Sequence, residues 1–245
     1  MSDERQQSET NHYLSTLEAP PIPELRRDGH EVADEIDEDA PLIIVKSIPR
    51  LIVRPYYSML GIKEASIDVT LREPVAQRLQ RAASLLPEGF SLLLLDGWRS
   101  GDVQRAIYEH FTNVASELGE DPGKYAFDLD ASLDRGFPTE DAPHRTGGAV
   151  DVTLVGPEGS EWPMGTEFDA ISPRSATRAL EVEFSSGLPI DSAALFGRRT
   201  LYYVMTAAGF TNYPEEWWHY DYGNAFWRFY GKLPDGNVFR TVMGV

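Results

Sequence analysis

A carboxylate inside a valine-rich strand segment constrains this chain most. Residues 149–155 alternate between apolar and polar side chains as a strand does, and Asp151 lies between Val150 and Val152. An isolated carboxylate is costly to bury unless it pairs with a cation or binds a metal ion. The fold must therefore bring Asp151 a partner, which is either an arginine such as Arg145 or a metal.

His144 precedes this strand by a short loop. Gly147 and Gly148 lie in that loop and allow the backbone to turn, so that the side chains of His144 and Asp151 can converge on one point. Two ligands of this kind are typical of a metal centre, and a third is needed to hold the ion while leaving a position for water.

A second segment, Glu216-Trp217-Trp218-His219, supplies another imidazole and another carboxylate. Residues three apart on a regular strand face opposite sides, so the chain must bend near Trp217 for Glu216 and His219 to reach the same site. With that bend, His219 completes the ligand set and Glu216 is free to act as a general base. Without it, the segment is an aromatic strand with a surface glutamate.

The composition narrows the possible ligands and partners. The chain has 245 residues and no cysteine, so any metal must be held by His, Asp or Glu. Asp and Glu number 39 against 22 Lys and Arg, an acidic balance that repels phosphate backbones and anionic lipids. We therefore expect neither nucleic acid nor membrane as a partner. The polar first residues lack the apolar stretch of a secretory signal, which predicts a cytoplasmic protein.

The periodicity predicts one α+β domain over residues 41–245, with a central antiparallel or mixed sheet that carries the metal site and helices packed against it. Residues 1–40 are polar and acidic, which predicts a flexible arm or, alternatively, an interaction tail. Strands are expected at 42–45, 51–53, 90–95, 149–155, 210–213 and 217–222. Helices are expected over 74–86, with a capping box formed by Thr70 and Glu73, after Ser100, and over 198–208.

Arg99 follows the buried apolar run 90–95, where a loop can aim its guanidinium into a cleft. An arginine there suits a developing oxyanion or a substrate carboxylate. An ion pair with Asp96 or Asp102 is the competing interpretation. The chain has no glycine-rich phosphate loop, no G-x-S-x-G motif and no H-E-x-x-H motif, which argues against dinucleotide enzymes, serine hydrolases of that class and helix-based zinc peptidases.

Four motifs occur in a fixed order: LLLLDGWR at 92–99, HRTGGAVDVTL at 144–154, PMGTEFD at 163–169 and EEWWHY at 215–220. In this order they resemble the D-alanyl-D-alanine dipeptidases of the vancomycin-resistance type, which are related to zinc D,D-carboxypeptidases and to the hedgehog amino-terminal domain. The chain departs from the family pattern at Ala142, where a serine is usual, and at Trp98, where a tyrosine is usual.

The resemblance implies hydrolysis of a small peptide, D-Ala-D-Ala or a related D,D-dipeptide, with one Zn²⁺ per chain. It assigns roles to six residues: zinc ligands His144, Asp151 and His219, catalytic base Glu216, oxyanion partner Arg99, and Asp169 for the substrate ammonium group. The alternatives are a D,D-carboxypeptidase that acts on longer peptidoglycan peptides and a zinc-binding module without activity.

Overall fold

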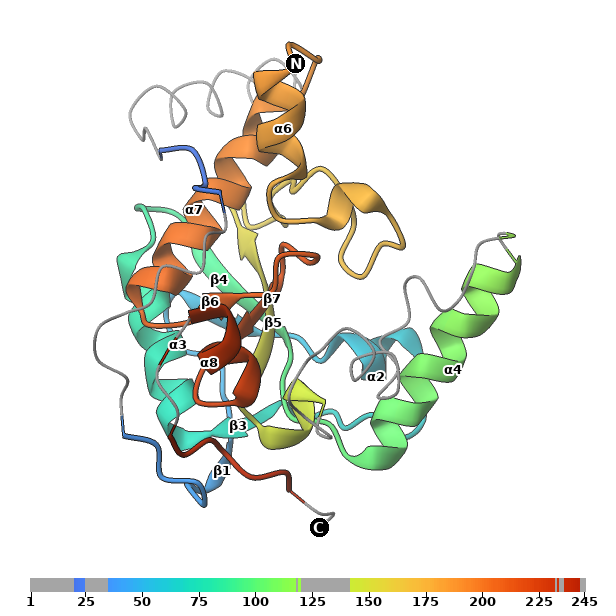
Figure 1. Ribbon diagram of the computed structural model, residues 1–245, viewed down its shortest axis with the longest axis vertical. Helices are drawn as coiled ribbons and strands as arrows, with labels where there is room; N and C mark the ends of the chain where they lie inside the picture. The colour runs from blue at the N-terminus through green and yellow to red at the C-terminus, as the bar shows by residue number, and fades with distance from the viewer. Residues whose placement is uncertain are drawn as a thin grey trace.

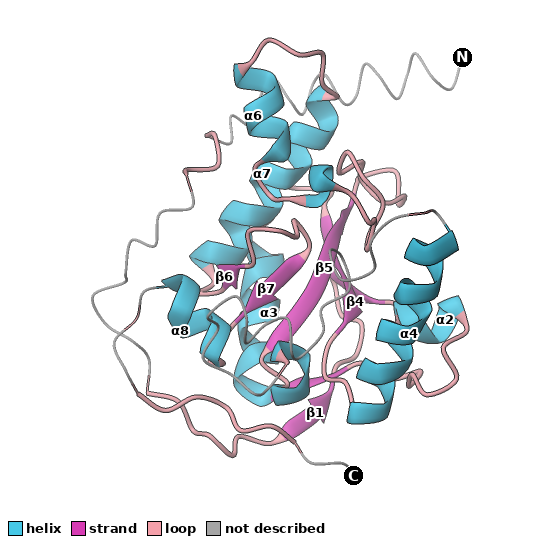
Figure 2. Cartoon of the chain, turned by 45° about the vertical axis from the view of Figure 1, so that its right-hand side comes forward, coloured by secondary structure: helices cyan, strands magenta, loops and turns pink. Residues whose placement is uncertain are grey.

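A five-stranded mixed sheet organises the structure, a computed structural model that describes residues 20–24, 35–117, 119, 142–231, 233 and 236–242. The strand order is β2-β4-β5-β7-β6, in which β2 and β4 are parallel and the other neighbours are antiparallel. Figure 2 shows β5 between β4 and β7. The strands are β2 (Leu51–Val53), β4 (Ser91–Asp96), β5 (Ala149–Val155), β6 (Thr211–Asn212) and β7 (His219–Asp221). The predicted α+β class with a central mixed sheet is confirmed.

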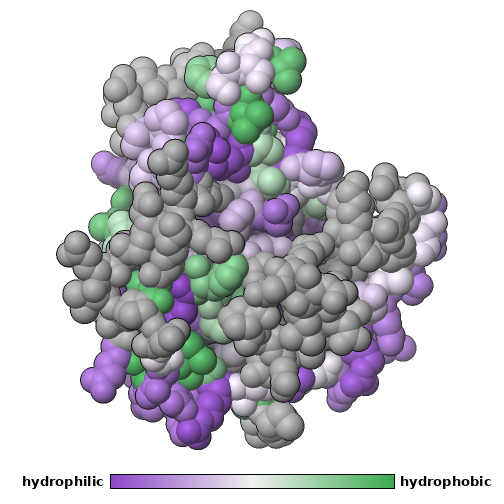
Figure 3. All heavy atoms as spheres, in the orientation of Figure 1, coloured by the Kyte–Doolittle hydropathy of each residue, from purple (hydrophilic) through white to green (hydrophobic). Residues whose placement is uncertain are grey.

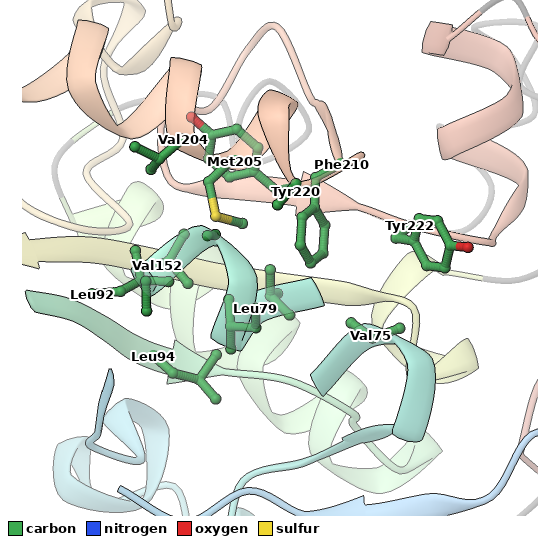
Figure 4. Packing of buried hydrophobic residues seen from close by; sticks show 14 of the residues in the cluster. Val75, Leu79, Leu92, Leu94, Val152, Val204, Met205, Phe210, Tyr220 and Tyr222 are labelled. Atoms are coloured by element: carbon green, nitrogen blue, oxygen red, sulfur yellow. The ribbon is translucent and has the colours of Figure 1, made fainter. Parts of the chain in front are cut away.

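One face of this sheet forms the main core. Val150, Val152 and Leu154 of β5 are fully buried among side chains from two helices, α3 (Glu73–Leu85) and α7 (Ser192–Ala207). In Figure 4, side chains of both helices surround Val152. Because side chains alternate along a strand, Asp151 and Thr153 lie on the opposite face. The core therefore fixes which way the carboxylate of Asp151 points.

The cap of α3 and the first residue of α7 differ from the sequence expectation. The expected capping box at Thr70 is wrong, because Thr70 belongs to β3 (Thr70–Arg72) and α3 is preceded by Arg72 without a side-chain cap. Pairing of β3 with β1 (Leu42–Ile44) uses the backbone of Thr70. Helix α7 begins at Ser192, earlier than expected, after Asp191, whose side chain accepts a hydrogen bond from the Ala193 N–H.

On the other face of the sheet, α2 (Tyr56–Leu60) packs against β4, and α4 (Gly101–Glu117) packs against α2. The two helices lie together in Figure 1, apart from α6 and α7. The Ser100 hydroxyl accepts a hydrogen bond from the Val103 N–H, which confirms the expected cap. Val103 and Ile107 of α4 pack with Tyr57 of α2. These two helices give the site-bearing face a wall.

The remaining elements are short. They are η2 (Pro143–Thr146), η3 (Pro173–Ser175), α6 (Ala179–Ser185) and α8 (Ala225–Gly231). Helix α6 buries Leu180 and leaves Val182 more than half exposed. Figure 3 shows apolar side chains at the end of the molecule formed by α6, where Phe184 and Leu188 are also more than half exposed.

Parts of the expected amino-terminal arm contact the domain. Ile22 and Ile36 are almost completely buried, at 1% and 4% exposure. The Ile22 N–H donates to Glu181 Oε1 at 2.9 Å, and the Tyr203 hydroxyl donates to the Pro21 carbonyl at 2.8 Å. Residues 1–19 and 25–34 lie outside the described residues, so the flexible arm and the boundary at residue 40 stay predictions. Among the described residues, no helix is long and apolar enough to cross a membrane.

Candidate active site

Two neighbouring strands and one turn bring three potential metal ligands together. Asp151 of β5 pairs directly with His219, the first residue of β7. Side chains of cross-strand partners lie on the same face, which places this carboxylate beside this imidazole. His144 comes from η2, which ends at Gly147 with a left-handed φ of 75°. A Cβ at Gly147 would lie 2.6 Å from a methyl group of Leu42, so this turn requires glycine.

The ligand atoms have the spacing of a small tetrahedral site. His144 Nε2 lies 3.2 Å from His219 Nδ1 and 3.4 Å from Asp151 Oδ2, and His219 Nδ1 lies 3.2 Å from Asp151 Oδ1. Ligands about 2.0–2.1 Å from a tetrahedral ion are separated by about 3.3 Å. All three residues are buried, and Asp151 Oδ1 has no hydrogen-bond partner. The described residues thus form a cluster that can hold a metal ion.

The outer nitrogen of each imidazole is held by an acceptor. His144 Nδ1 lies 2.7 Å from the Gly97 carbonyl oxygen, and His219 Nε2 lies 3.2 Å from Asp221 Oδ2. Both contacts require an N–H on the outer nitrogen, so the lone pairs of the inner nitrogens face each other and Asp151. Asp221 is completely buried and accepts a second hydrogen bond, from Asn224 Nδ2 at 2.6 Å.

The electrostatics of the cluster favour a cation. Burial alone would lower the pKa of His219, but the carboxylates of Asp221 and Asp151 outweigh burial and hold this pKa well above its usual range. Burial alone would raise the pKa of Asp151, but His144 and His219 hold it below the usual value. A positive charge is therefore stabilised among these groups, whether it is a proton or a metal ion.

Glu216 lies in the turn before β7, and the bend expected near Trp217 is confirmed. The Glu216 N–H donates to the Tyr213 carbonyl at 3.1 Å, and the strand begins only at His219. Glu216 Oε2 is 3.8 Å from His219 Nδ1. Burial raises the pKa of Glu216 to about 8, and nearby Asp151 adds to the shift. A divalent cation in the cluster would lower this pKa, because it stabilises the ionised carboxylate.

Arg99 connects the cluster of His144, Asp151 and His219 to the wall formed by α2 and α4. Its guanidinium donates to Asp96 Oδ2 at 2.6 Å, Asp151 Oδ2 at 3.1 Å, the Tyr57 hydroxyl at 3.3 Å and Gln104 Oε1 at 3.2 Å. The ion pair with Asp96 is present, but it does not exclude Arg99 from the site. The alternative partner considered for Asp151, an arginine such as Arg145, is present as Arg99, which lies 3.1 Å from Asp151 Oδ2.

Asp169 faces the same site from a loop. It has a left-handed backbone with φ of 58°, and its Oδ2 accepts a hydrogen bond from the Tyr57 hydroxyl. Burial raises the pKa of Asp169 to about 7, and Asp151 contributes to the shift while the Tyr57 hydrogen bond opposes it. The Tyr57 hydroxyl thus bridges the Asp169 carboxylate and the Arg99 guanidinium through two hydrogen bonds.

Comparison with known proteins decides the family. The family model described as D-ala-D-ala dipeptidase, Peptidase M15, matches residues 63–235. The chain belongs to this D-Ala-D-Ala dipeptidase family. Several relatives carry the name D-alanyl-D-alanine dipeptidase. The one from Synechocystis is 27% identical over 203 residues, which cover 76% of this chain and 82% of the relative. The one from Enterococcus faecium is 29% identical over 60% of this chain and 69% of the relative. The one from Streptomyces coelicolor is 34% identical over 54% of this chain and 62% of the relative.

Membership of the D-Ala-D-Ala dipeptidase family supports peptidase activity and a small peptide as substrate. The structure brings all six residues singled out from the sequence to one site: His144, Asp151, His219, Glu216, Arg99 and Asp169. Of the two departures from the family pattern, Ala142 is buried and Trp98 donates from its indole to the Arg145 carbonyl at 3.2 Å.

Sequence reasoning missed three groups of this dipeptidase-family site. Asp221 has a local signal, because residues two apart on a strand share a face and His219 is two residues away. The Gly97 carbonyl has none, since a main-chain acceptor leaves no trace in residue type. Tyr57 is 42 residues from Arg99 and 112 from Asp169 in the chain, so only the tertiary fold shows the contact.

Proposed function

We propose that the protein is a zinc-dependent D,D-dipeptidase that hydrolyses D-Ala-D-Ala or a closely related free dipeptide. The observation that carries the proposal is the geometry of one cluster. His144 Nε2 and His219 Nδ1 lie 3.2 Å apart, each lies within 3.4 Å of one oxygen of the Asp151 carboxylate, and Glu216 Oε2 is 3.8 Å from His219 Nδ1. The family and the names of the relatives supply the substrate class.

The donor set suits zinc. Two imidazole nitrogens and one carboxylate oxygen are a common ligand set of catalytic zinc, which keeps a further position open. When bound, zinc lowers the pKa of a water molecule and polarises the substrate carbonyl. Glu216 then takes the proton of the attacking water on its carboxylate and donates it to the departing amino group. The bend before β7 holds Glu216 Oε2 3.8 Å from His219 Nδ1, which supports the role of a base rather than that of a ligand.

Arg99 is proposed to stabilise the oxyanion that develops as the peptide carbonyl is attacked. Its guanidinium is buried, always charged, and oriented by Asp96, Gln104 and Tyr57. Such a fixed donor needs little reorganisation during the reaction, which is why it lowers the barrier.

Asp169 is proposed to bind the free ammonium group of the substrate. A half-buried carboxylate beside the Tyr57 hydroxyl forms a strong charge-assisted contact with an amine, and an acylated amine would lose this contact. The pairing therefore favours substrates with a single residue before the scissile bond.

The test is a substrate panel for the zinc-loaded protein. The free D,D-, L,D- and L,L-dialanines and N-acetyl-D-Ala-D-Ala are incubated with the protein, and released alanine is quantified by chromatography. We expect release from free D-Ala-D-Ala, loss of release after treatment with a chelator, and recovery on addition of zinc. Equal cleavage of the acetylated peptide would instead indicate a D,D-carboxypeptidase. Zinc binding without any cleavage would refute the dipeptidase and indicate a binding module.

A further inference from the structure

Among the described residues, the buried guanidinium of Arg198 in α7 donates hydrogen bonds only to main-chain oxygens. It is 1% exposed, and it donates to the carbonyls of Met164, Arg174 and Ala176, each at 2.7 Å. Burial lowers its pKa to about 10, so the group stays charged at neutral pH. A buried cation without a carboxylate partner is costly, and its three hydrogen bonds must offset that cost.

The three carbonyls belong to the two ends of one loop, residues 164–176, that carries Asp169 in its middle. Met164 lies at the first end, and Arg174 and Ala176 lie at the second. Arg198 therefore closes the base of this loop, as in compact loops whose ends lie close together. Within the loop, the Ser175 hydroxyl donates to the Ala170 carbonyl at 2.7 Å, next to Asp169.

The same loop is joined to the turn that carries Glu216. The Trp217 N–H donates to the Ser175 carbonyl at 3.0 Å, and its indole N–H donates to Thr166 Oγ1 at 2.8 Å. The guanidinium of Arg198 lies 5.9 Å from the centroid of the Trp217 ring. Arg198 and Trp217 thus connect the segments on either side of the substrate's expected position.

We propose that Arg198 is a positioning residue that fixes Asp169 relative to Glu216 and thereby limits the length of the substrate. This inference rests on the proposed function, because the span that matters runs from the ammonium-binding carboxylate to the base at the scissile bond. With both loops held together, that span is fixed, and substrates whose amino group lies at another distance from the scissile bond are disfavoured. A shift of about 1 Å between catalytic groups can cost about a hundredfold in rate.

The metal ligands do not depend on this arrangement. His144, Asp151 and His219 are held by strand register, by the Gly97 carbonyl and by Asp221, none of which contacts Arg198 through a hydrogen bond. Loss of the Arg198 contacts should therefore change substrate selection and leave metal binding in place.

The experiment compares Arg198→Lys with a matched variant, Arg50→Lys, in the zinc-loaded protein. Lysine cannot form three planar hydrogen bonds, but it retains a positive charge. Arg50 likewise donates to main-chain carbonyls, those of Ser84, Leu86, Pro87 and Phe90, but at the Ser91 end of β4, away from the site. Thr166→Val is the gentler second variant, because it removes only the hydrogen bond to the Trp217 indole.

Two quantities are measured for each variant. The first is the ratio of kcat/KM for free D-Ala-D-Ala to that for its N-acetyl derivative. We expect Arg198→Lys to lower this ratio about tenfold, mainly through a higher KM for the free dipeptide, and Arg50→Lys to leave it unchanged. The second is amide hydrogen exchange, which should become about tenfold faster in both 164–176 and 213–218 in Arg198→Lys.

The outcomes separate this inference from the proposed function. Unchanged exchange in the two segments, or the same change in ratio for Arg50→Lys, overturns the positioning role. If Arg198→Lys does not fold, Thr166→Val decides: a smaller shift in the same direction supports the role, and wild-type behaviour overturns it. If the wild-type protein cleaves no dipeptide, the proposed function fails, while joint loosening of the two segments would still support the connection through Arg198.

Discussion

The metal cluster and the Asp169 loop face each other across one site, but they are held by different means. Asp151 and His219 occupy paired positions on adjacent strands, so the hydrogen bonds of the sheet fix their separation. Asp169 lies on a loop, and its place depends on contacts with Tyr57 and on the distant Arg198. Two of the three proposed metal ligands are thus fixed by the sheet, and the group proposed for substrate selection is attached to a loop.

This difference makes the two regions separable. A rigid strand pair can keep ligands within the few tenths of an ångström that a metal requires, whereas a loop can change without disturbing the sheet. Substitutions in one region should therefore alter turnover or metal affinity, and those in the other should alter the choice of substrate.

Glu216→Gln should have the largest effect. The variant keeps the shape of the side chain but cannot accept the proton of the attacking water, so we expect kcat to fall by about 10³-fold or more. Zinc content, measured by elemental analysis, should match the wild-type protein, because Glu216 lies outside the three-ligand cluster. Loss of zinc in this variant would mean that Glu216 is a ligand and that the assignment is wrong.

Asp221→Asn should weaken zinc binding by about 10- to 100-fold, because the negative charge that supports His219 Nε2 is lost. Competition with a chromophoric chelator measures this affinity. Asp191→Asn is a suitable control, since Asp191 caps α7 away from the site and asparagine also caps helices. Equal zinc affinity in the two variants would contradict the supporting role of Asp221.

Asp169→Asn should raise the KM for free D-Ala-D-Ala by about tenfold or more, because a neutral amide binds an ammonium group less strongly than a carboxylate does. Asparagine tolerates the left-handed backbone at this position, so the loop should keep its conformation. Steady-state kinetics with the free and the N-acetylated dipeptide measure the effect. A fall in kcat with unchanged KM would mean that Asp169 takes part in the chemical step, and that the two regions do not have separate roles.

The same substitution should change stability in a pH-dependent way in the metal-free protein. Burial raises the pKa of Asp169 to about 7, against 3.8 for the unperturbed group. Above about pH 4 the unfolded chain ionises Asp169, whereas the folded protein keeps it protonated until about pH 7. The free energy of unfolding therefore falls between these two pH values and stays lower above them. Asp169→Asn should therefore gain free energy of unfolding relative to the wild-type protein near pH 8 but not near pH 4. Urea unfolding at both pH values measures this difference, and equal gains would contradict the raised pKa.

Ile22→Ala should leave catalysis unchanged and lower the free energy of unfolding by about 2–4 kcal/mol, since its side chain is almost completely buried. Ile22 is bound to Glu181 of α6, which is outside both regions of the site. Chemical unfolding and steady-state kinetics measure the two effects. A changed ratio between free and acetylated dipeptide would show that the docked segment also controls the Asp169 loop.

Local sequence patterns predicted the strand pair and not the loop contacts. The alternation in 149–155 predicts β5 and the direction of Asp151, and the spacing of Glu216 and His219 predicts the bend. The start of α3 is predicted to within one residue, but the capping box is wrong because Thr70 pairs with Ile44 of β1. Tyr57 and Arg198 were missed because their partners are distant in sequence or are main-chain oxygens, which residue identity does not reveal.

The left-handed backbone of Asp169 restricts how the substrate range of this protein can evolve. Glutamate would reach one methylene further and is the simplest way to move a carboxylate, but glycine, asparagine and aspartate are the residues that adopt this conformation readily. If Asp169 binds the substrate ammonium group as proposed, a change of substrate by direct replacement of this side chain would strain the backbone. Relocation of the whole loop is the less costly route for selection or for an engineer.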